Sequence, residues 1–126
     1  MQGSPLKTLE DRRVLVVEDE YFLADDLAHA LTAFGAVVLG PVPTEEKALT
    51  LIESGPVDAA VLDINRRGRS VYALADLLRQ RGVPFVFATG YDESSVPPAY
   101  RDVPRWEKPF NPRNLAMALQ GLVRPT

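Results

Sequence analysis

The chain has 126 residues, of which 46% are hydrophobic and 25% charged, with a formal net charge of -3. This balance is typical of one globular domain. The absence of cysteine excludes disulfides and thiolate metal sites, and without a basic run we expect no nucleic-acid partner. No apolar stretch approaches the roughly 18 residues of a membrane span. We therefore expect a cytoplasmic protein with no membrane contact, formed by a polar N-terminal tail over 1–11 and one folded domain over 12–124.

Short apolar runs predict strands at intervals along the chain. They are continuous rather than alternating, which is expected of strands covered on both faces. The runs lie at 14–17, 37–39, 59–62 and 85–87, with a weaker candidate at 103–106.

Helical patterns separate these runs. They cover 21–34, 45–53 and 71–81, and a last helix opens at Asn111 and Pro112. The glycines that follow the first three helices, where a left-handed residue is expected, are Gly35, Gly55 and Gly82. Two consecutive prolines in 92–102 exclude a long helix there, so we expect a short helix or an irregular loop.

The alternation of strands and helices predicts an α/β fold, a three-layer (βα)5 sandwich around a parallel five-stranded sheet. In such sheets, ligands bind beyond the carboxyl ends of the strands. Polar residues stand at four of these ends: Glu18, Asp19 and Glu20 after the first, Asp63 after the third, Thr89 after the fourth and Lys108 after the fifth.

Acids gathered at one edge repel each other by roughly 4 kcal/mol for two carboxylates about 4 Å apart at an effective dielectric near 20. Oxygen ligands without histidine or cysteine favour a hard cation, Mg²⁺ above all. A metal, a lysine and a hydroxyl around a carboxylate also suit phosphoryl transfer, with the carboxylate as nucleophile. Glu20 is also interpreted as an acid near the positive end of the first helix, and His29 as a surface residue.

Four features together resemble the receiver domain of response regulators over roughly 12–124. They are the acidic pair Glu18-Asp19, Asp63 in "AVLDIN", Thr89 in "FATGY" and Lys108 in "EKPF". The string at 87–91 further resembles the FAT GUY subgroup, whose members often pair with histidine kinases of the HWE type. The resemblance implies the flavodoxin-like strand order 2-1-3-4-5.

The resemblance also implies residue roles. Asp63 would accept phosphate from the phosphohistidine of a sensor kinase, and Thr89 and Lys108 would contact the phosphoryl group. Asp19 and Asp63 would bind Mg²⁺ directly, or Ca²⁺ or Mn²⁺ in its place. Glu18 would act through water, and the backbone carbonyl of Asn65 would complete the protein ligands. The Lys108–Pro109 bond in such domains is usually cis.

Two positions depart from the common receiver pattern. Arg105 stands where most receivers carry a switching tyrosine or phenylalanine, and the neighbouring aromatic is Trp106, interpreted as a packing residue. Arg67 replaces a common proline. Tyr91 is a hypothetical shield that protects an acyl phosphate from water.

We therefore expect a single-domain response regulator, a monomer or weak homodimer, that catalyses only its own phosphorylation and dephosphorylation. Its output would pass through an unknown downstream protein, or the domain would act as a phosphate sink. One alternative is a phosphate-independent scaffold, disfavoured by the intact site. The other alternative is an aspartyl-phosphate phosphatase that acts on small molecules. It is disfavoured because such enzymes carry a second acid, as proton donor, two residues after the nucleophile, where this chain has Asn65.

Overall fold

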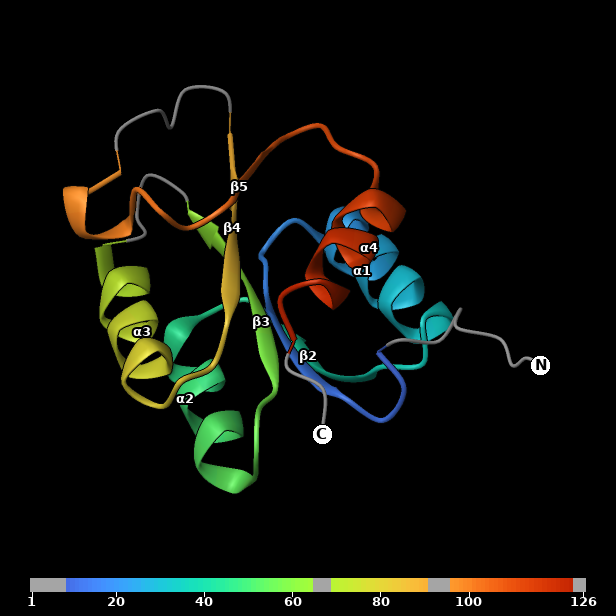
Figure 1. Cartoon of the computed structure of the whole chain (residues 1–126), viewed down its shortest axis with the longest axis horizontal. Helices are drawn as coiled ribbons and strands as arrows, with labels where there is room; N and C mark the ends of the chain where they lie inside the picture. Colours follow the sequence, from blue (N-terminus) through green and yellow to red (C-terminus); the bar gives the residue numbers. More distant parts are fainter. Residues whose placement is uncertain (1–8, 65–68, 91–95, 124–126) are drawn as a thin grey trace.

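The computed structural model describes residues 9–64, 69–90 and 96–123. Strands and helices alternate along the chain (Figure 1). In chain order they are β1 Arg13–Val17, α1 Tyr21–Ala33, β2 Val37–Val42, α2 Glu45–Ser54, β3 Ala59–Ile64, α3 Arg69–Gln80, β4 Phe85–Thr89, the 3-10 helix η1 Pro98–Tyr100, β5 Arg105–Glu107 and α4 Pro112–Gln120.

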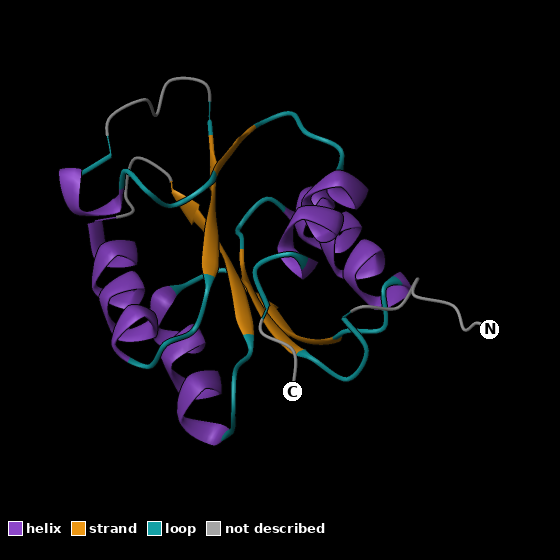
Figure 2. Ribbon diagram, in the orientation of Figure 1, coloured by secondary structure: helices purple, strands orange, loops and turns teal. Residues whose placement is uncertain are grey.

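The five strands form one parallel sheet in the order β2-β1-β3-β4-β5, which confirms the expected flavodoxin-like topology. Helices α2 and α3 cover one face of the sheet, and α1 and α4 cover the other (Figures 1 and 2). The two central strands β3 and β4 are buried along their whole length. This two-sided burial explains why their sequences are apolar without alternation as far as Asp63 and Thr89.

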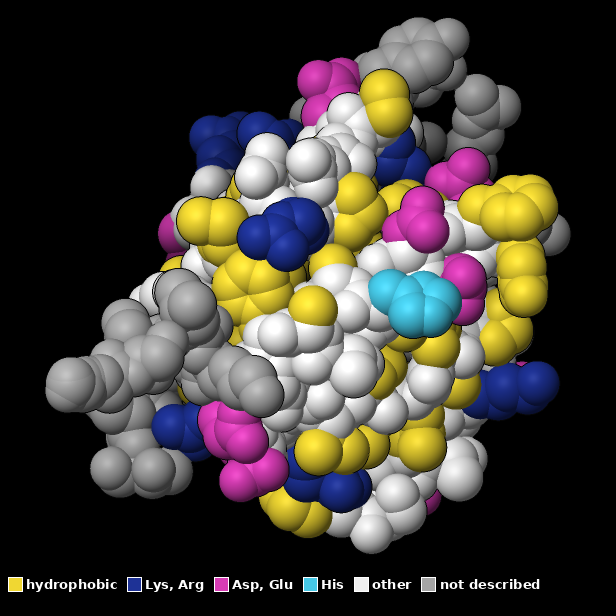
Figure 3. Space-filling model, turned by 90° about the vertical axis from the view of Figure 1, so that its right-hand side faces the viewer, with side chains coloured by type: hydrophobic (Ala, Val, Ile, Leu, Met, Phe, Trp, Pro, Cys, Tyr) yellow, Lys and Arg dark blue, Asp and Glu magenta, His cyan; other side chains and the backbone are white. Residues whose placement is uncertain are grey.

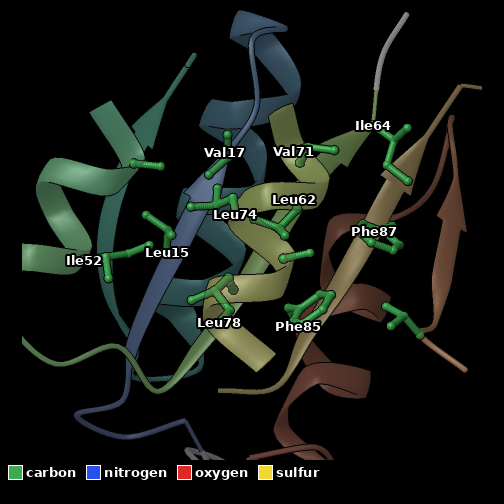
Figure 4. Packing of buried hydrophobic residues seen from close by; sticks show 14 of the residues in the cluster. Leu15, Val17, Ile52, Leu62, Ile64, Val71, Leu74, Leu78, Phe85 and Phe87 are labelled. Carbon is green, nitrogen blue, oxygen red and sulfur yellow. The ribbon is translucent and has the colours of Figure 1, made fainter. Parts of the chain in front are cut away.

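Alternate residues of each strand enter two separate cores. Leu15 and Val17 of β1 pack toward α2 and α3, whereas Val14 and Val16 pack toward α1 and α4. Figure 4 shows the first core, in which side chains from α3 such as Leu78 meet those of the central strands. The two cores fix the sheet rigidly, so the residues at its carboxyl edge have defined positions.

Helix ends follow the sequence signals with one exception. The Thr44 and Asn111 side chains cap α2 and α4 by accepting backbone N–H bonds. Gly35 and Gly82 have left-handed φ values of 94° and 72°. The prediction of the same conformation at Gly55 is wrong, because its φ is 172°. Gly55 precedes a proline, and a residue in that place is driven to extended backbone.

The connection from β4 to β5 contains η1, as expected for a proline-rich stretch. Tyr100 of η1 is buried, and its hydroxyl donates to the carbonyl of Tyr72 at 3.1 Å. Arg79 of α3 donates to the Ala99 carbonyl at 2.8 Å and pairs with Asp102 at 3.2 Å. These contacts fasten the short segment to α3 over the described part of the connection.

The folded part of the chain begins earlier than the expected boundary at residue 12. Leu9 is fully buried in the core beneath α1 and α4, and its N–H donates to the Phe34 carbonyl at 3.2 Å. Residues 9–11 therefore belong to the folded domain rather than to a tail over 1–11. Across the described ranges, none of the helices has both the length and the apolar character that a membrane span requires.

Candidate functional site

The carboxyl edge of the sheet holds a group of buried polar side chains. Among the residues that the structure describes, Glu18, Asp63 and Thr89 are the buried polar or charged ones. They come from the ends of β1, β3 and β4, which the parallel sheet brings side by side. Burying polar groups costs free energy unless they are paired, so their concentration at one edge marks a functional site.

Backbone hydrogen bonds position these residues. The N–H of Glu18 donates to the Val42 carbonyl at 2.9 Å, which joins the end of β1 to β2. The N–H of Lys108 donates to the Thr89 carbonyl at 2.8 Å, which places the lysine beside β4. The Lys108–Pro109 bond is cis, as predicted. The site is therefore built on rigid strands and the turns that directly follow them.

The Lys108 ammonium group lies at the centre of the site. Its Nζ is 2.7 Å from Glu20 Oε1, 3.0 Å from Glu18 Oε2 and 3.0 Å from Asp63 Oδ1. The ammonium group donates hydrogen bonds to Glu20 and Glu18, and its contact with Asp63 is an ion pair. The structure thus brings Glu18, Asp63 and Lys108 together as the sequence predicts.

The carboxylates also fit a divalent cation. Glu18, Asp19 and Asp63 each offer one oxygen, and these oxygens all lie within 4.8 Å of one another. Glu18 Oε1 is buried and has no hydrogen-bond partner among the described residues, so a lone pair is available to a ligand. Carboxylate oxygens suit a hard ion such as Mg²⁺. Asn65, the fourth predicted ligand, lies outside the described residues.

Burial and charge shift the protonation of two groups. Burial, followed by the charge of Asp63, raises the pKa of Glu18 to about 7, although hydrogen bonds from the Glu20 N–H and Lys108 oppose the shift. Burial lowers the pKa of Lys108, but the close contacts with Glu20 and Asp63 outweigh it and leave that pKa above its ordinary value. Lys108 is therefore charged at neutral pH, and one cation faces several acids.

One residue of the site has a contact that sequence reasoning missed. Glu20 was interpreted as an acid at the start of a helix, and it is indeed the N-cap of α1, but its side chain makes no capping hydrogen bond. It binds Lys108 instead. In the sequence, the available signal was that Glu20 directly follows the acidic pair. The contact itself joins positions 20 and 108, and a contact between such distant positions leaves no periodic pattern in the sequence.

Other predicted residues fall outside the cluster. Trp106 is half-buried and packs edge-to-face on Phe110 with ring centroids 5.9 Å apart, so it is a packing residue as expected. Arg105 is exposed. Figure 3 looks onto the face of α1 and α4, where the histidine, in cyan, lies among acidic side chains; His29 is 3.5 Å from Asp25. Arg67 and Tyr91 lie outside the described residues.

A hollow of about 260 Å³ borders the acidic cluster. It is lined by residues from the start of α1 and from the ends of β1 and β2, namely Glu18, Asp19, Tyr21, Ala24, Asp25, Pro41 and Pro43. The neighbouring rings of Tyr21 and Phe22 are 73% and 80% exposed. The acids are therefore reachable from the solvent beside the start of α1.

Comparison with known proteins identifies relatives of this chain. No family model matches it. The solution structure of SdrG from Sphingomonas melonis Fr1 is 40% identical, with a TM-score of 0.77, over 89% of this chain and 96% of that one. A second SdrG structure, of the BeF3-activated conformation from Pseudomonas melonis Fr1, is 38% identical with a TM-score of 0.73 and covers 96% of this chain and all of that one.

Two further relatives are more distant. A response regulator receiver protein from Sinorhizobium medicae WSM419 is 28% identical with a TM-score of 0.72, over 90% of this chain and 95% of that one. The transcriptional regulatory protein PdtaR of Mycobacterium tuberculosis is 27% identical over 113 residues, which are 86% of this chain. The chain spans about half the length of that curated relative, 55%.

Proposed function

Because the chain belongs to the receiver-domain family of response regulators, which act in two-component signalling, we propose that Asp63 accepts a phosphoryl group from a histidine kinase. One observation carries this assignment. Asp63 is buried at the carboxyl edge of a central strand, and its Oδ1 lies 3.0 Å from the Lys108 ammonium group inside the acidic cluster. Glu18 is also buried and bonded to Lys108, but it follows β1, whereas Asp63 lies in β3, the middle strand of the sheet.

The transfer is a substitution at phosphorus. A carboxylate oxygen of Asp63 forms a new O–P bond as the P–N bond to the donor imidazole breaks. The electron pair of that bond stays on the imidazole nitrogen, which takes a proton from water. The product is an acyl phosphate on Asp63, and its hydrolysis regenerates the carboxylate and inorganic phosphate.

A divalent cation, Mg²⁺ by the chemistry of its ligands, belongs to this site. Asp19 and Asp63 would hold it directly, Glu18 through water, and the Asn65 carbonyl would complete the protein ligands. When bound, the ion supplies positive charge that offsets the phosphoryl oxygens. The close carboxylate oxygens and the unpartnered Glu18 Oε1 support this assignment.

Lys108 and Thr89 act on the transferring group. The Lys108 ammonium already lies against the Asp63 carboxylate, so it neutralises charge that develops on the phosphoryl oxygens. Thr89 ends β4 next to Ile64 of β3, one residue beyond the pairing of Asp63 with Ala88. From this place its hydroxyl donates a hydrogen bond to a phosphoryl oxygen.

The donor is a sensor kinase, and we assign it to the HWE type. The string from Phe87 to Tyr91 and the similarity to SdrG support this assignment. The hollow lies beside Glu18 and Asp19, whose carboxylate oxygens are within 4.8 Å of one in Asp63. The phosphorylated domain then acts by contact with a downstream protein, or it drains phosphate from a shared kinase.

Incubation with acetyl phosphate, with and without Mg²⁺, tests the proposal by intact mass. The wild type is expected to gain one phosphate only with Mg²⁺, and Asp63→Asn is expected to gain none. Equal labelling of the wild type and Asp63→Asn would contradict the assignment of Asp63. A wild type that takes no phosphate from acetyl phosphate or an HWE kinase, and binds no Mg²⁺, would instead favour a phosphate-independent scaffold.

A further inference from the structure

Glu20 uses its side chain in the site although it stands at a helix start. As the N-cap of α1 it makes no side-chain capping bond, and its carboxylate accepts from Lys108 Nζ at 2.7 Å. Its backbone N–H meanwhile donates to Glu18 Oε2 at 3.1 Å. The residue is therefore fixed to the site through its backbone, and its side chain bonds the lysine that faces Asp63.

Lys108 has three acidic partners in this state. Its ammonium group donates hydrogen bonds to Glu18 and Glu20 and forms an ion pair with Asp63. When Asp63 becomes an acyl phosphate, the N–H beside it passes to a phosphoryl oxygen, and a second hydrogen bond to this more highly charged group requires that Lys108 give up one of the two glutamates. The question is which glutamate loses its hydrogen bond to Lys108 at the smallest cost in free energy.

Exposure decides between the two glutamates. The Glu18 side chain is 0% exposed, so the loss of Lys108 would leave it without that partner in a buried place. The Glu20 side chain is 61% exposed, so its carboxylate can return to water. Glu20 is thus the partner that Lys108 exchanges most readily.

We propose that Glu20 is a positioning residue that holds Lys108 in the resting site and releases it when Asp63 is phosphorylated. The inference rests on the proposed function and adds a residue to it. The Glu20–Lys108 bond stabilises the unphosphorylated state alone. Removing it favours the phosphorylated state by about two- to fivefold, the range that an exposed ion pair contributes.

Beryllofluoride titration in Mg²⁺ measures this preference at equilibrium. Glu20→Gln removes the negative charge. Glu20→Asp keeps the charge on a side chain that is one methylene shorter, which moves the carboxylate away from Lys108. Asp25→Asn is the matched control, because it removes an exposed charge that lines the same hollow. We expect both Glu20 variants to bind beryllofluoride about two- to fivefold more tightly, and Asp25→Asn to bind like the wild type.

An effect of charge through space would give another pattern. Glu20→Asp would then match the wild type, whereas Glu20→Gln and Asp25→Asn would both bind more tightly, and that result would overturn the inference. Exchange of the Lys108 ammonium protons with water, followed by ¹⁵N NMR without beryllofluoride, tests the resting contact separately. We expect faster exchange in Glu20→Asp than in the wild type, and unchanged exchange would also overturn the inference.

Failure of the proposed function is distinguishable from failure of this inference. A wild type that binds neither beryllofluoride nor phosphate contradicts the function, and the inference falls with it even where ammonium exchange shows the Glu20 contact. A wild type that binds beryllofluoride while Glu20→Asp has the same affinity contradicts the inference alone.

Discussion

Two cations of this molecule bridge separate elements, and their surroundings differ. Lys108 faces Glu18, Glu20 and Asp63, and its side chain is 18% exposed. Arg79 pairs with Asp102, and these side chains are 42% and 74% exposed. The arginine network is matched charge for charge and faces water, whereas the lysine is outnumbered by acids at a buried edge.

This difference separates a structural contact from a functional one. Arg79 also donates to the Ala99 carbonyl and lies over the Tyr100 ring at 5.2 Å, so it holds η1 in place and has no excess charge to offset. The Lys108 cluster keeps an excess of negative charge that a bound cation would neutralise. Excess charge at a buried edge, rather than the presence of an ion pair, indicates the site.

The largest expected effect is the loss of the central cation. Lys108→Met leaves buried carboxylates without their partner, and we expect it to lower the free energy of unfolding by about 3–5 kcal/mol in Mg²⁺-free buffer. Urea denaturation measures this change. Equal stability of the variant and the wild type would mean that the acids are not charged together in the folded protein.

A pH titration sharpens the comparison. The pKa of Glu18 is raised to about 7 from an ordinary value of 4.5, so between these values the folded state retains a proton that the unfolded state releases. The metal-free protein is therefore expected to lose stability as pH rises through this window, by about 3 kcal/mol in total. Glu18→Gln should abolish the loss in urea denaturation.

The same proton competes with a cation, which gives this prediction a second readout. Mg²⁺ affinity, measured by calorimetry, is expected to rise as pH increases from about 6 to about 8, because Glu18 becomes ionised. A pH-independent affinity, or a metal-free protein that gains stability over the window, would contradict the assigned environment of Glu18.

The smallest expected effect is at the exposed network. Arg79→Met keeps most of the apolar contact with η1 but removes the pair with Asp102, and we expect a loss of about 1 kcal/mol or less. Because Arg79 has no part in the acidic cluster, the Mg²⁺ affinity of this variant should equal that of the wild type. A several-fold change in affinity would show that the two networks are linked.

The elements were predictable where burial leaves a pattern in the sequence. Central strands such as β3 are apolar up to Asp63 because helices cover both faces, and the caps at Thr44 and Asn111 are local signals. The strand expected over 37–39 extends to Val42, although Gly40 and Pro41 are poor strand formers, because pairing with β1 continues through a register shift. Pairing between strands is not visible in one strand's own sequence.

The site was predictable in its members and less so in its contacts. Glu18, Asp63 and Lys108 stand at strand ends, and a parallel sheet gathers such ends at one edge. The Glu20 contact was not predictable, because it depends on the direction of two side chains that the fold brings together. The burial of Leu9 was likewise not predictable, because a single apolar residue in a polar segment forms no periodic pattern, and Leu9 was assigned to the polar tail.

The central claim is that Asp63 carries the phosphoryl group, and one measurement locates that group directly. The protein is treated with acetyl phosphate and Mg²⁺, reduced with borohydride, which converts an acyl phosphate to an alcohol, and mapped by tandem mass spectrometry. We predict reduction at position 63 alone. Reduction at Asp19, or at several acids in comparable amounts, would contradict the account.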